Sequence, residues 1–176
     1  AHVMRGDLYA MIGACHVAER RIRALIDRYG VSRVQEGVDY MLDYSERRVR
    51  SMIASWPDGT YFGRKMVDTD YAGHNDLQVD CTIVVKGDEL TVDFTGTSPQ
   101  GAGHINSTPG STGSWVLLSL CAIMPDVPMN SGFLRPVRMV MPEGTLVNGK
   151  SPASVATNTV NMGSSIGDAV MKALEP

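Results

Sequence analysis

The sequence is short of the features that mark secreted scaffolds, membrane proteins and nucleic-acid binders. It has three cysteines, Cys15, Cys81 and Cys121, without CxxC spacing. This argues against a disulfide framework or a thiolate zinc site and favours a reducing compartment, which we expect to be the cytoplasm. The most apolar stretch, residues 115–124, is much shorter than the roughly 18 residues of a membrane span, so no membrane contact is expected. The net charge of -3 over 176 residues argues against a nucleic-acid partner.

The first third of the chain has the three-four apolar spacing of amphipathic helices. One run extends from Leu8 to Tyr29 and a second from Val34 to Ile53. Asp7 is positioned to cap the first helix and Gly30 to end it. Two helices joined by so short a turn predict an N-terminal antiparallel helical hairpin over residues 7–55.

The remainder of the chain has the patterns of strands, turns and short helices. Residues 77–85 and 90–94 alternate in polarity around a Lys-Gly-Asp turn, which predicts a β-hairpin over residues 76–96. A buried helix is expected at 114–124, a strand at 134–141 and a C-terminal helix at 164–174. The predicted fold class is α+β, with a mainly antiparallel β segment after the helical hairpin.

These patterns divide the chain into residues 1–56, the helical hairpin, and residues 57–176, the mixed β/α segment. We expect the two together to form part of one larger domain. Residues 1–4 are set aside, and Met4 is interpreted as an initiator that follows a short added segment.

The glycine-rich loop over residues 93–113 has the highest concentration of polar groups that could act on a ligand. Its glycines allow the backbone to approach a ligand closely. Asp93, His104 and Asn106 are the main candidates, because an imidazole can exchange a proton near neutral pH and the other two can orient a bound molecule. The alternative is a structural loop whose side chains bond its own backbone, and the residues alone favour neither reading.

A second polar loop contains Asp70, His74 and Asp76, all of them metal-ligand types. Their spacing matches no recognised metal motif, and the turn-forming composition favours a solvated turn. No metal ligand is therefore assigned to this chain.

Several stretches resemble the hydantoinase B/oxoprolinase family. The strongest is Val-Asp-Phe-Thr-Gly-Thr-Ser-Pro-Gln at 92–100, followed by Gly-His-Ile-Asn at 103–106. Others are Gly-Asp-Leu at 6–8, Glu-Arg-Arg-Ile at 19–22, Ser-Glu-Arg-Arg-Val-Arg at 45–50, Pro-Asp-Gly-Thr-Tyr at 57–61, Asn-Ser-Gly-Phe-Leu-Arg-Pro at 130–136 and Met-Pro-Glu-Gly-Thr-Leu-Val-Asn at 141–148. They cover nearly the whole chain in one order.

The resemblance implies part of the B-type subunit of an ATP-dependent, cytoplasmic cyclic-amide hydrolase acting on hydantoins, 5-oxoproline or lactams. It implies ATP and a divalent metal (Mg, Zn or Mn) in the intact complex and a hydantoinase A-type, ATP-binding partner in a hetero-oligomer. Family members are longer, and their metal ligands precede the Gly-Asp-Leu helix. We therefore expect a fragment that holds neither cofactor and is inactive alone.

Two further residues and two rival functions remain open. Asn130 and Arg135 form a second polar set, in which the guanidinium could pair with a phosphate or carboxylate of the substrate. One rival is a subunit of an ATP-dependent acetone- or acetophenone-type carboxylase, with a ketone substrate. The other is a non-catalytic scaffold, which the arginine-rich helical region suits.

Overall fold

The computed structural model describes residues 2–175, and their side chains from residue 4 onward. The elements in chain order are α1 (His2–Tyr29), α2 (Val31–Ile53), β1 (Gly59–Thr69), β2 (Asn75–Lys86), β3 (Glu89–Asp93), α3 (Pro109–Ile123), β4 (Val137–Val140), the π-helix η1 (Asn158–Met162) and α4 (Gly163–Leu174). They confirm the α+β class. The chain forms two compact units, residues 1–43 and 44–176, so the division falls within α2.

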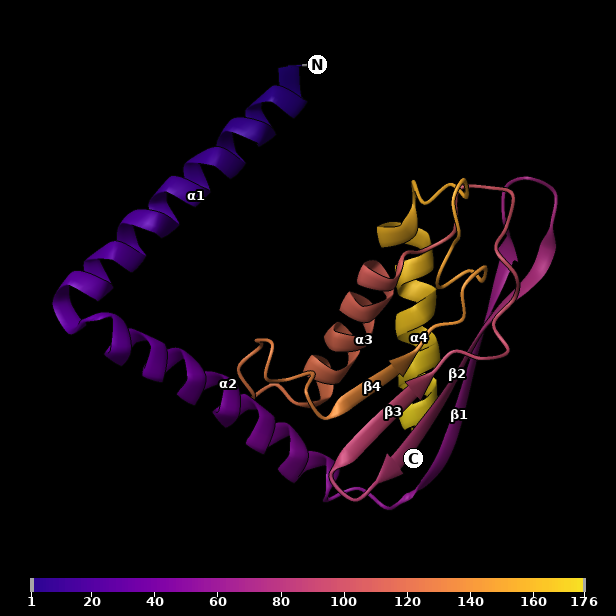
Figure 1. The fold of residues 1–176 in the computed structure, drawn as a ribbon. Coiled ribbons are helices and arrows are strands. Elements are labelled where there is room, and N and C mark those ends of the chain that lie inside the picture. Colours follow the sequence, from indigo (N-terminus) through magenta and orange to yellow (C-terminus); the bar gives the residue numbers. More distant parts are fainter. Residues whose placement is uncertain (1, 176) are drawn as a thin grey trace. The chain divides into compact units, whose positions relative to one another are not determined.

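The first unit consists of α1 and the beginning of α2. Gly30 separates the helices with a φ of +80°, a conformation that glycine adopts readily, and its N–H still bonds the Ile26 carbonyl at 2.7 Å. Both helices and the glycine turn are as predicted. The side-by-side packing of a hairpin is not, because within this unit the two helices diverge from Gly30 (Figure 1).

The predicted cap of the first helix was wrong. The helix begins at His2, and Asp7 lies inside it. None of residues 2–6 is a proline, and Gly6 costs an interior helix position only about 1 kcal/mol, so nothing upstream stops the helix.

The second unit is built on a four-stranded sheet in the order β1-β2-β3-β4. β1 pairs antiparallel with β2, with Gly63 opposite Cys81, and β2 pairs antiparallel with β3. β3 and β4 are parallel, with Val92 opposite Met139, and α3 lies in the connection between them. The predicted β-hairpin is confirmed as β2–β3. β1 was not predicted as a strand.

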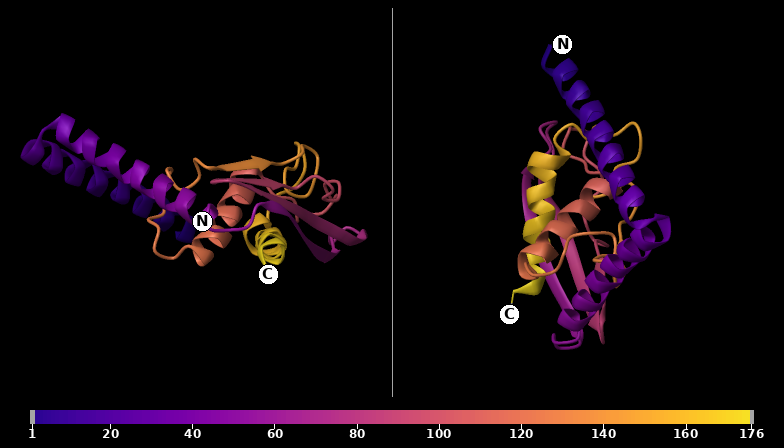
Figure 2. Two further views of the ribbon diagram at one scale, coloured as in Figure 1. Left: turned by 90° about the horizontal axis from the view of Figure 1, so that it is seen from below. Right: turned by 90° about the vertical axis from the view of Figure 1, so that its left-hand side faces the viewer.

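One face of the sheet is covered by α4, with α3 alongside it (Figures 1 and 2). Gly63 of β1 lies so close to α4 that a Cβ atom there would be 2.1 Å from the Ala169 carbonyl oxygen. The core between these layers contains Phe94, Leu120 and Ile166, each fully buried. Burial also raises the pKa of Cys81 to about 12, so this thiol is an inert core group.

No helix among the described residues is long and apolar enough to cross a membrane.

Candidate functional site

Three segments far apart in sequence meet at one end of the second unit. They are the β1–β2 loop around residues 70–74, the glycine-rich loop around 101–106, and the start of η1 (Figure 1). Backbone N–H groups of Ala102 and Gly103 bond the Asp70 carboxylate, and Thr157 bonds the His104 carbonyl. We call this meeting of three segments the loop cluster.

Asp70 is the centre of the loop cluster. Its side chain is fully buried. One carboxylate oxygen accepts the N–H groups of Ala72 at 2.7 Å and His74 at 3.0 Å; the other lies 2.8 Å from Nδ1 of the His74 ring. Burial raises the pKa of Asp70, but the hydrogen bonds from Ala72, His74 and Gly103 outweigh it and hold the pKa well below its usual range. The carboxylate is therefore ionised and joins two loops.

The glycines of the second loop are required by this arrangement. A Cβ on Gly103 would be 1.6 Å from the Asp70 carbonyl oxygen, and one on Gly101 would be 3.0 Å from Asp70 Cβ. A side chain at Gly103 would thus force the loops apart. Close packing of the two loops therefore explains why Gly101 and Gly103 are glycines. From the sequence alone, the glycines of this loop were compatible with either a ligand site or a structural loop.

His104 is half-buried, and its ring is stacked on Tyr71. The ring centroids are 5.2 Å apart and the planes differ by 8°. The His104 carbonyl accepts hydrogen bonds from the N–H and the hydroxyl of Thr157, which fix its backbone. Tyr71 has a φ of +62°, unusual for a residue with a side chain. Its place beside His104 had no signal in the sequence.

Asn106 is fully buried, and its amide is bonded to the backbone around it. Its Oδ1 accepts the N–H of Gly101, and its Nδ2 donates to the carbonyls of Gly101, Gly103 and Ser154. The side chain therefore holds the glycine-rich loop closed and ties it to the segment before η1.

Asp93 lies at the end of β3 and bonds its own turn. Its Oδ1 accepts the N–H of Thr95 at 2.8 Å, an arrangement common where a strand enters a loop. The side chain is half-buried. No described hydrogen bond joins Asp93 to His104.

Asn130 and Arg135 lie together in a second polar group, against the end of α2. Asn130 Nδ2 donates to the Ser45 hydroxyl at 2.8 Å, and Arg135 Nη1 bonds Glu46 Oε2 at 3.0 Å. Hydrogen bonds from Arg135 and Arg50 lower the pKa of Glu46. The structure thus gathers four of the five predicted residues into two groups and leaves Asp93 outside both. His104 and Asn106 lie in the loop cluster, and Asn130 and Arg135 lie beside α2.

The divalent metal implied by the family resemblance has no matching ligand set here. Among the residues whose side chains are described, no three His, Cys, Asp or Glu groups come together to hold a metal ion. Asp70 and His74 form a pair, and the Asp70 oxygens already accept N–H groups. The side chains that the structure describes therefore offer no set that fits a metal ion, and no chemical step is assigned to one.

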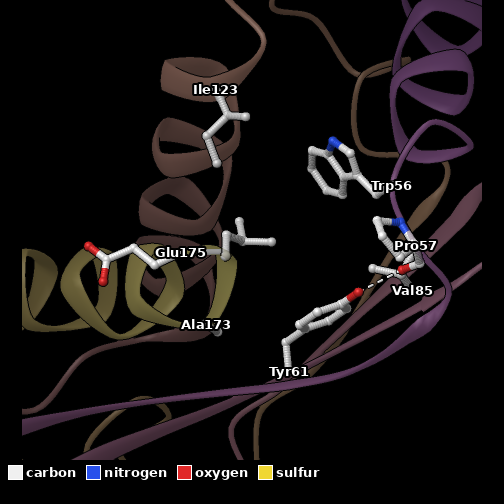
Figure 3. Close-up of a pocket in the computed structure, with 8 residues that line it drawn as sticks. Trp56, Pro57, Tyr61, Val85, Ile123, Ala173 and Glu175 are labelled. Carbon is white, nitrogen blue, oxygen red and sulfur yellow. Dashed lines mark hydrogen bonds between the residues drawn. The ribbon is translucent and has the colours of Figure 1, made fainter.

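An apolar cavity of about 360 Å³ lies elsewhere in the second unit, between α3, α4 and β1 (Figure 3). Its walls include Trp56, Tyr61, Ile123 and Leu174. The Tyr61 hydroxyl is occupied by a hydrogen bond to the Pro57 carbonyl at 2.8 Å, and the Glu175 carboxylate points away from the aromatic residues (Figure 3). The cavity offers no group placed for proton transfer.

Comparison with known proteins gives one consistent result. The family model for hydantoinase B/oxoprolinase matches residues 1–176. The chain is 36% identical over 181 residues to the B-type subunit of a putative D-/L-hydantoinase of Pseudomonas sp. (strain NS671), covering 96% of this chain and 30% of that protein.

Two solved structures share the fold. The crystal structure of ATP-dependent caprolactamase from Pseudomonas jessenii superposes with a TM-score of 0.87 at 34% identity, covering 98% of this chain and 30% of that one. Nucleotide-free acetone carboxylase gives a TM-score of 0.68 at 20% identity, covering 82% of this chain and 21% of that one. At that identity the second match shows a common fold only.

The sheet and its covering helices form an α+β segment that superposes on part of a longer chain. The chain belongs to the hydantoinase B/oxoprolinase family, which confirms the resemblance found in the sequence. It spans about 30% of the length of the Pseudomonas hydantoinase chain that it matches.

Proposed function

We propose that this chain is part of the B-type subunit of an ATP-dependent cyclic-amide hydrolase of the hydantoinase, 5-oxoprolinase or caprolactamase type. The observation that carries the proposal is the match to caprolactamase over 98% of the chain, at 34% identity and a TM-score of 0.87. The match to the Pseudomonas hydantoinase chain at 36% identity supports it independently of structure.

In this proposal the chain works with an A-type subunit that holds ATP, and activity requires the complex and the rest of the B-type subunit. The coverage of only 30% of each relative supports the need for more than this chain. A divalent metal, if the complex holds one, has its ligands outside the residues described here. The free cysteines support a cytoplasmic location.

The five candidate residues have unequal support as parts of a site. His104 is the strongest, because its ring is half-exposed in a loop held on both sides and no described hydrogen bond engages its nitrogens. Asn106 contributes by holding that loop in place. Asp93, Asn130 and Arg135 bond neighbouring protein groups, so a substrate would have to share or replace those bonds.

A scaffold role has one observation in its favour. Large apolar side chains of the first unit are exposed, among them Leu8, Met11, Ile12, Ile22 and Leu25. Exposed apolar surface of this extent is typical of protein–protein contact. The carboxylase alternative has only the shared fold with acetone carboxylase behind it.

The test uses the full-length B-type protein with its A-type partner. Caprolactam, 5-oxoproline and hydantoin are each supplied with ATP, and ring opening and ADP release are measured. The proposal expects ADP release that depends on at least one cyclic amide. ADP release that responds only to acetone or acetophenone with bicarbonate would establish the carboxylase instead. Unchanged turnover in the complex that carries His104→Ala would favour the scaffold.

A further inference from the structure

Helix α1 has an apolar stripe along its whole length. Its members follow one another at alternating intervals of four and three residues, and they are Met4, Leu8, Met11, Cys15, Ala18, Ile22, Leu25 and Tyr29. Ile12 and Ile26 lie beside this row and widen it. We call these ten residues the α1 stripe. All of them except Ile26 are exposed, so the stripe is an apolar surface in contact with water.

The first unit has no core that could stabilise α1. Among its described side chains, those of residues 4–43, none is buried. Side-chain bonds such as Arg23–Glu19 and Gln35–Asp39 join residues of the same helix, and pairs of this kind stabilise a helix only weakly. A helix in water is marginally stable, and most of its stability in a protein comes from packing its apolar face. We therefore expect another surface to cover the α1 stripe in the intact protein.

The composition of the stripe argues against a second copy of the same helix as that surface. A two-stranded coiled coil has two apolar positions in seven, filled by large branched side chains and flanked by charged residues. In the α1 stripe the flanking residues Ile12 and Ile26 are apolar. The middle of the row has the small residues Cys15 and Ala18. A third apolar position in seven is typical of a helix that packs against a globular core.

The B-type protein itself has enough chain to supply this core. The match to the Pseudomonas hydantoinase chain covers 30% of that protein, so most of its length lies outside the match. Two surfaces within one polypeptide meet at a high effective concentration, which favours contact inside the subunit over contact between subunits. On the other side of α1, Arg20 and Asp27 are exposed and charged, so one covering surface is sufficient.

We propose that the α1 stripe docks onto an apolar surface of the B-type polypeptide outside these 176 residues, within the same subunit. The proposal rests on the function proposed above, which makes this chain part of a B-type subunit. It adds that the first unit is completed by that subunit alone, before the A-type partner binds.

The test uses Cys15, an exposed free thiol within the stripe, as a reporter of its coverage. The rate of Cys15 alkylation by iodoacetamide is measured by mass spectrometry in this chain, in the full-length B-type protein, and in the complex with the A-type partner. We expect alkylation to be at least about 10-fold slower in the full-length B-type protein than in this chain, because the reaction then requires local opening. The slower rate should depend neither on protein concentration nor on the A-type partner.

Equally fast alkylation of Cys15 in this chain and in the full-length B-type protein would overturn the proposal. Protection that appears only with the A-type partner would instead make the stripe a contact between the two kinds of subunit. Protection that increases with B-type concentration would make it a contact with a second copy. Protection already complete in this chain would mean that these 176 residues cover the stripe. A complex that opens no cyclic amide would refute the proposed hydrolase function without changing these rates.

A matched pair of variants tests which face of α1 docks. Ile22→Asp changes the stripe, and Val17→Asp makes the same kind of change on another face of the helix; both side chains are exposed in this chain, at 52% and 38%. In the full-length B-type protein we expect Ile22→Asp to speed Cys15 alkylation by about 10-fold, because a carboxylate is costly to bury. Val17→Asp should change the rate by less than about twofold, as for a surface substitution. Equal rates in the two variants would show that the stripe is not the docking face. If Ile22→Asp does not fold, the comparison of the wild-type proteins still decides the matter.

Discussion

The two units of the chain place their apolar residues differently. In residues 44–176 a large set of apolar side chains lies between a sheet and two helices, and Phe94, Leu120 and Ile166 are fully buried. In the first unit the apolar positions of α1 are exposed, with Leu8 at 56% and Leu25 at 48%. The helical periodicity is clear both in α1 and in α4. Periodicity thus shows that a face is apolar, but not what covers it.

The two units also suit different functions, a reactive site in one case and contact with another surface in the other. The second unit holds the loop cluster and the polar group beside α2, both built from bonds between distant segments. The first unit offers an apolar surface and local ion pairs such as Arg23–Glu19, four residues apart. A reactive site requires side chains held in place by bonds between distant segments. Contact with another surface requires only an exposed apolar face with local ion pairs.

Matched leucine substitutions should give the largest contrast between the units. Leu120→Ala, in α3, should lower the free energy of unfolding by about 2–5 kcal/mol, because it leaves a cavity in the core. Leu25→Ala, in α1, should change it by no more than about 0.5 kcal/mol, because the side chain is already in solvent. Urea unfolding of this chain measures both. Equal losses would show that the first unit has a core of its own.

Substitutions of amide side chains should show a smaller difference in unfolding free energy between the two units. Asn106→Ala should cost about 1–3 kcal/mol of unfolding free energy, because buried backbone groups of the glycine-rich loop lose their partner. Gln35→Ala, which removes an exposed bond to Asp39 in α2, is the control and should have little effect. A neutral Asn106→Ala would mean that the loop is held by other contacts.

The response to acid should come from the second unit. The pKa of Asp70 is lower in the folded chain than in the unfolded one, so its contribution to stability is present above the unfolded value near 4 and is lost as pH falls below it. Unfolding measured between pH 7 and pH 3 should show this loss. Asp70→Asn should be less stable at pH 7 and should show a weaker dependence on pH. A parallel curve for the variant would exclude Asp70 as the source.

The sequence predicted those elements whose pattern is local. The β2–β3 hairpin, α3 and α4 follow from apolar spacing and turn residues, and their boundaries agree within a few residues except at the start of α3. β1 was missed because charged residues such as Arg64 and Lys65 interrupt its alternation; their partners, Asp80 and Asp168, are far along the chain. The parallel β3–β4 pair also depends on residues more than forty positions apart.

The candidate site could be predicted only in part from local sequence patterns. The glycine-rich loop and His104 were identified by residue type, and Asn106 by its place in the motif. The role of Asp70 was not predicted, because a buried carboxylate that joins two loops has the same local sequence as a solvated turn. The positive φ of Tyr71 and its stacking on His104 depend on that fold and left no sequence signal.

A role of His104 in turnover is tested by comparing two histidines, one in each unit, in the complex of the full-length B-type protein with its A-type partner. Cyclic-amide turnover is measured for His104→Ala and His16→Ala and divided by the folded fraction of each variant. We expect turnover to fall by roughly 10²–10⁴-fold in His104→Ala, the usual range for a group that transfers a proton, and not to fall in His16→Ala. Undiminished turnover per folded molecule in His104→Ala would contradict a catalytic role for this residue. The loop cluster would then have a structural role only.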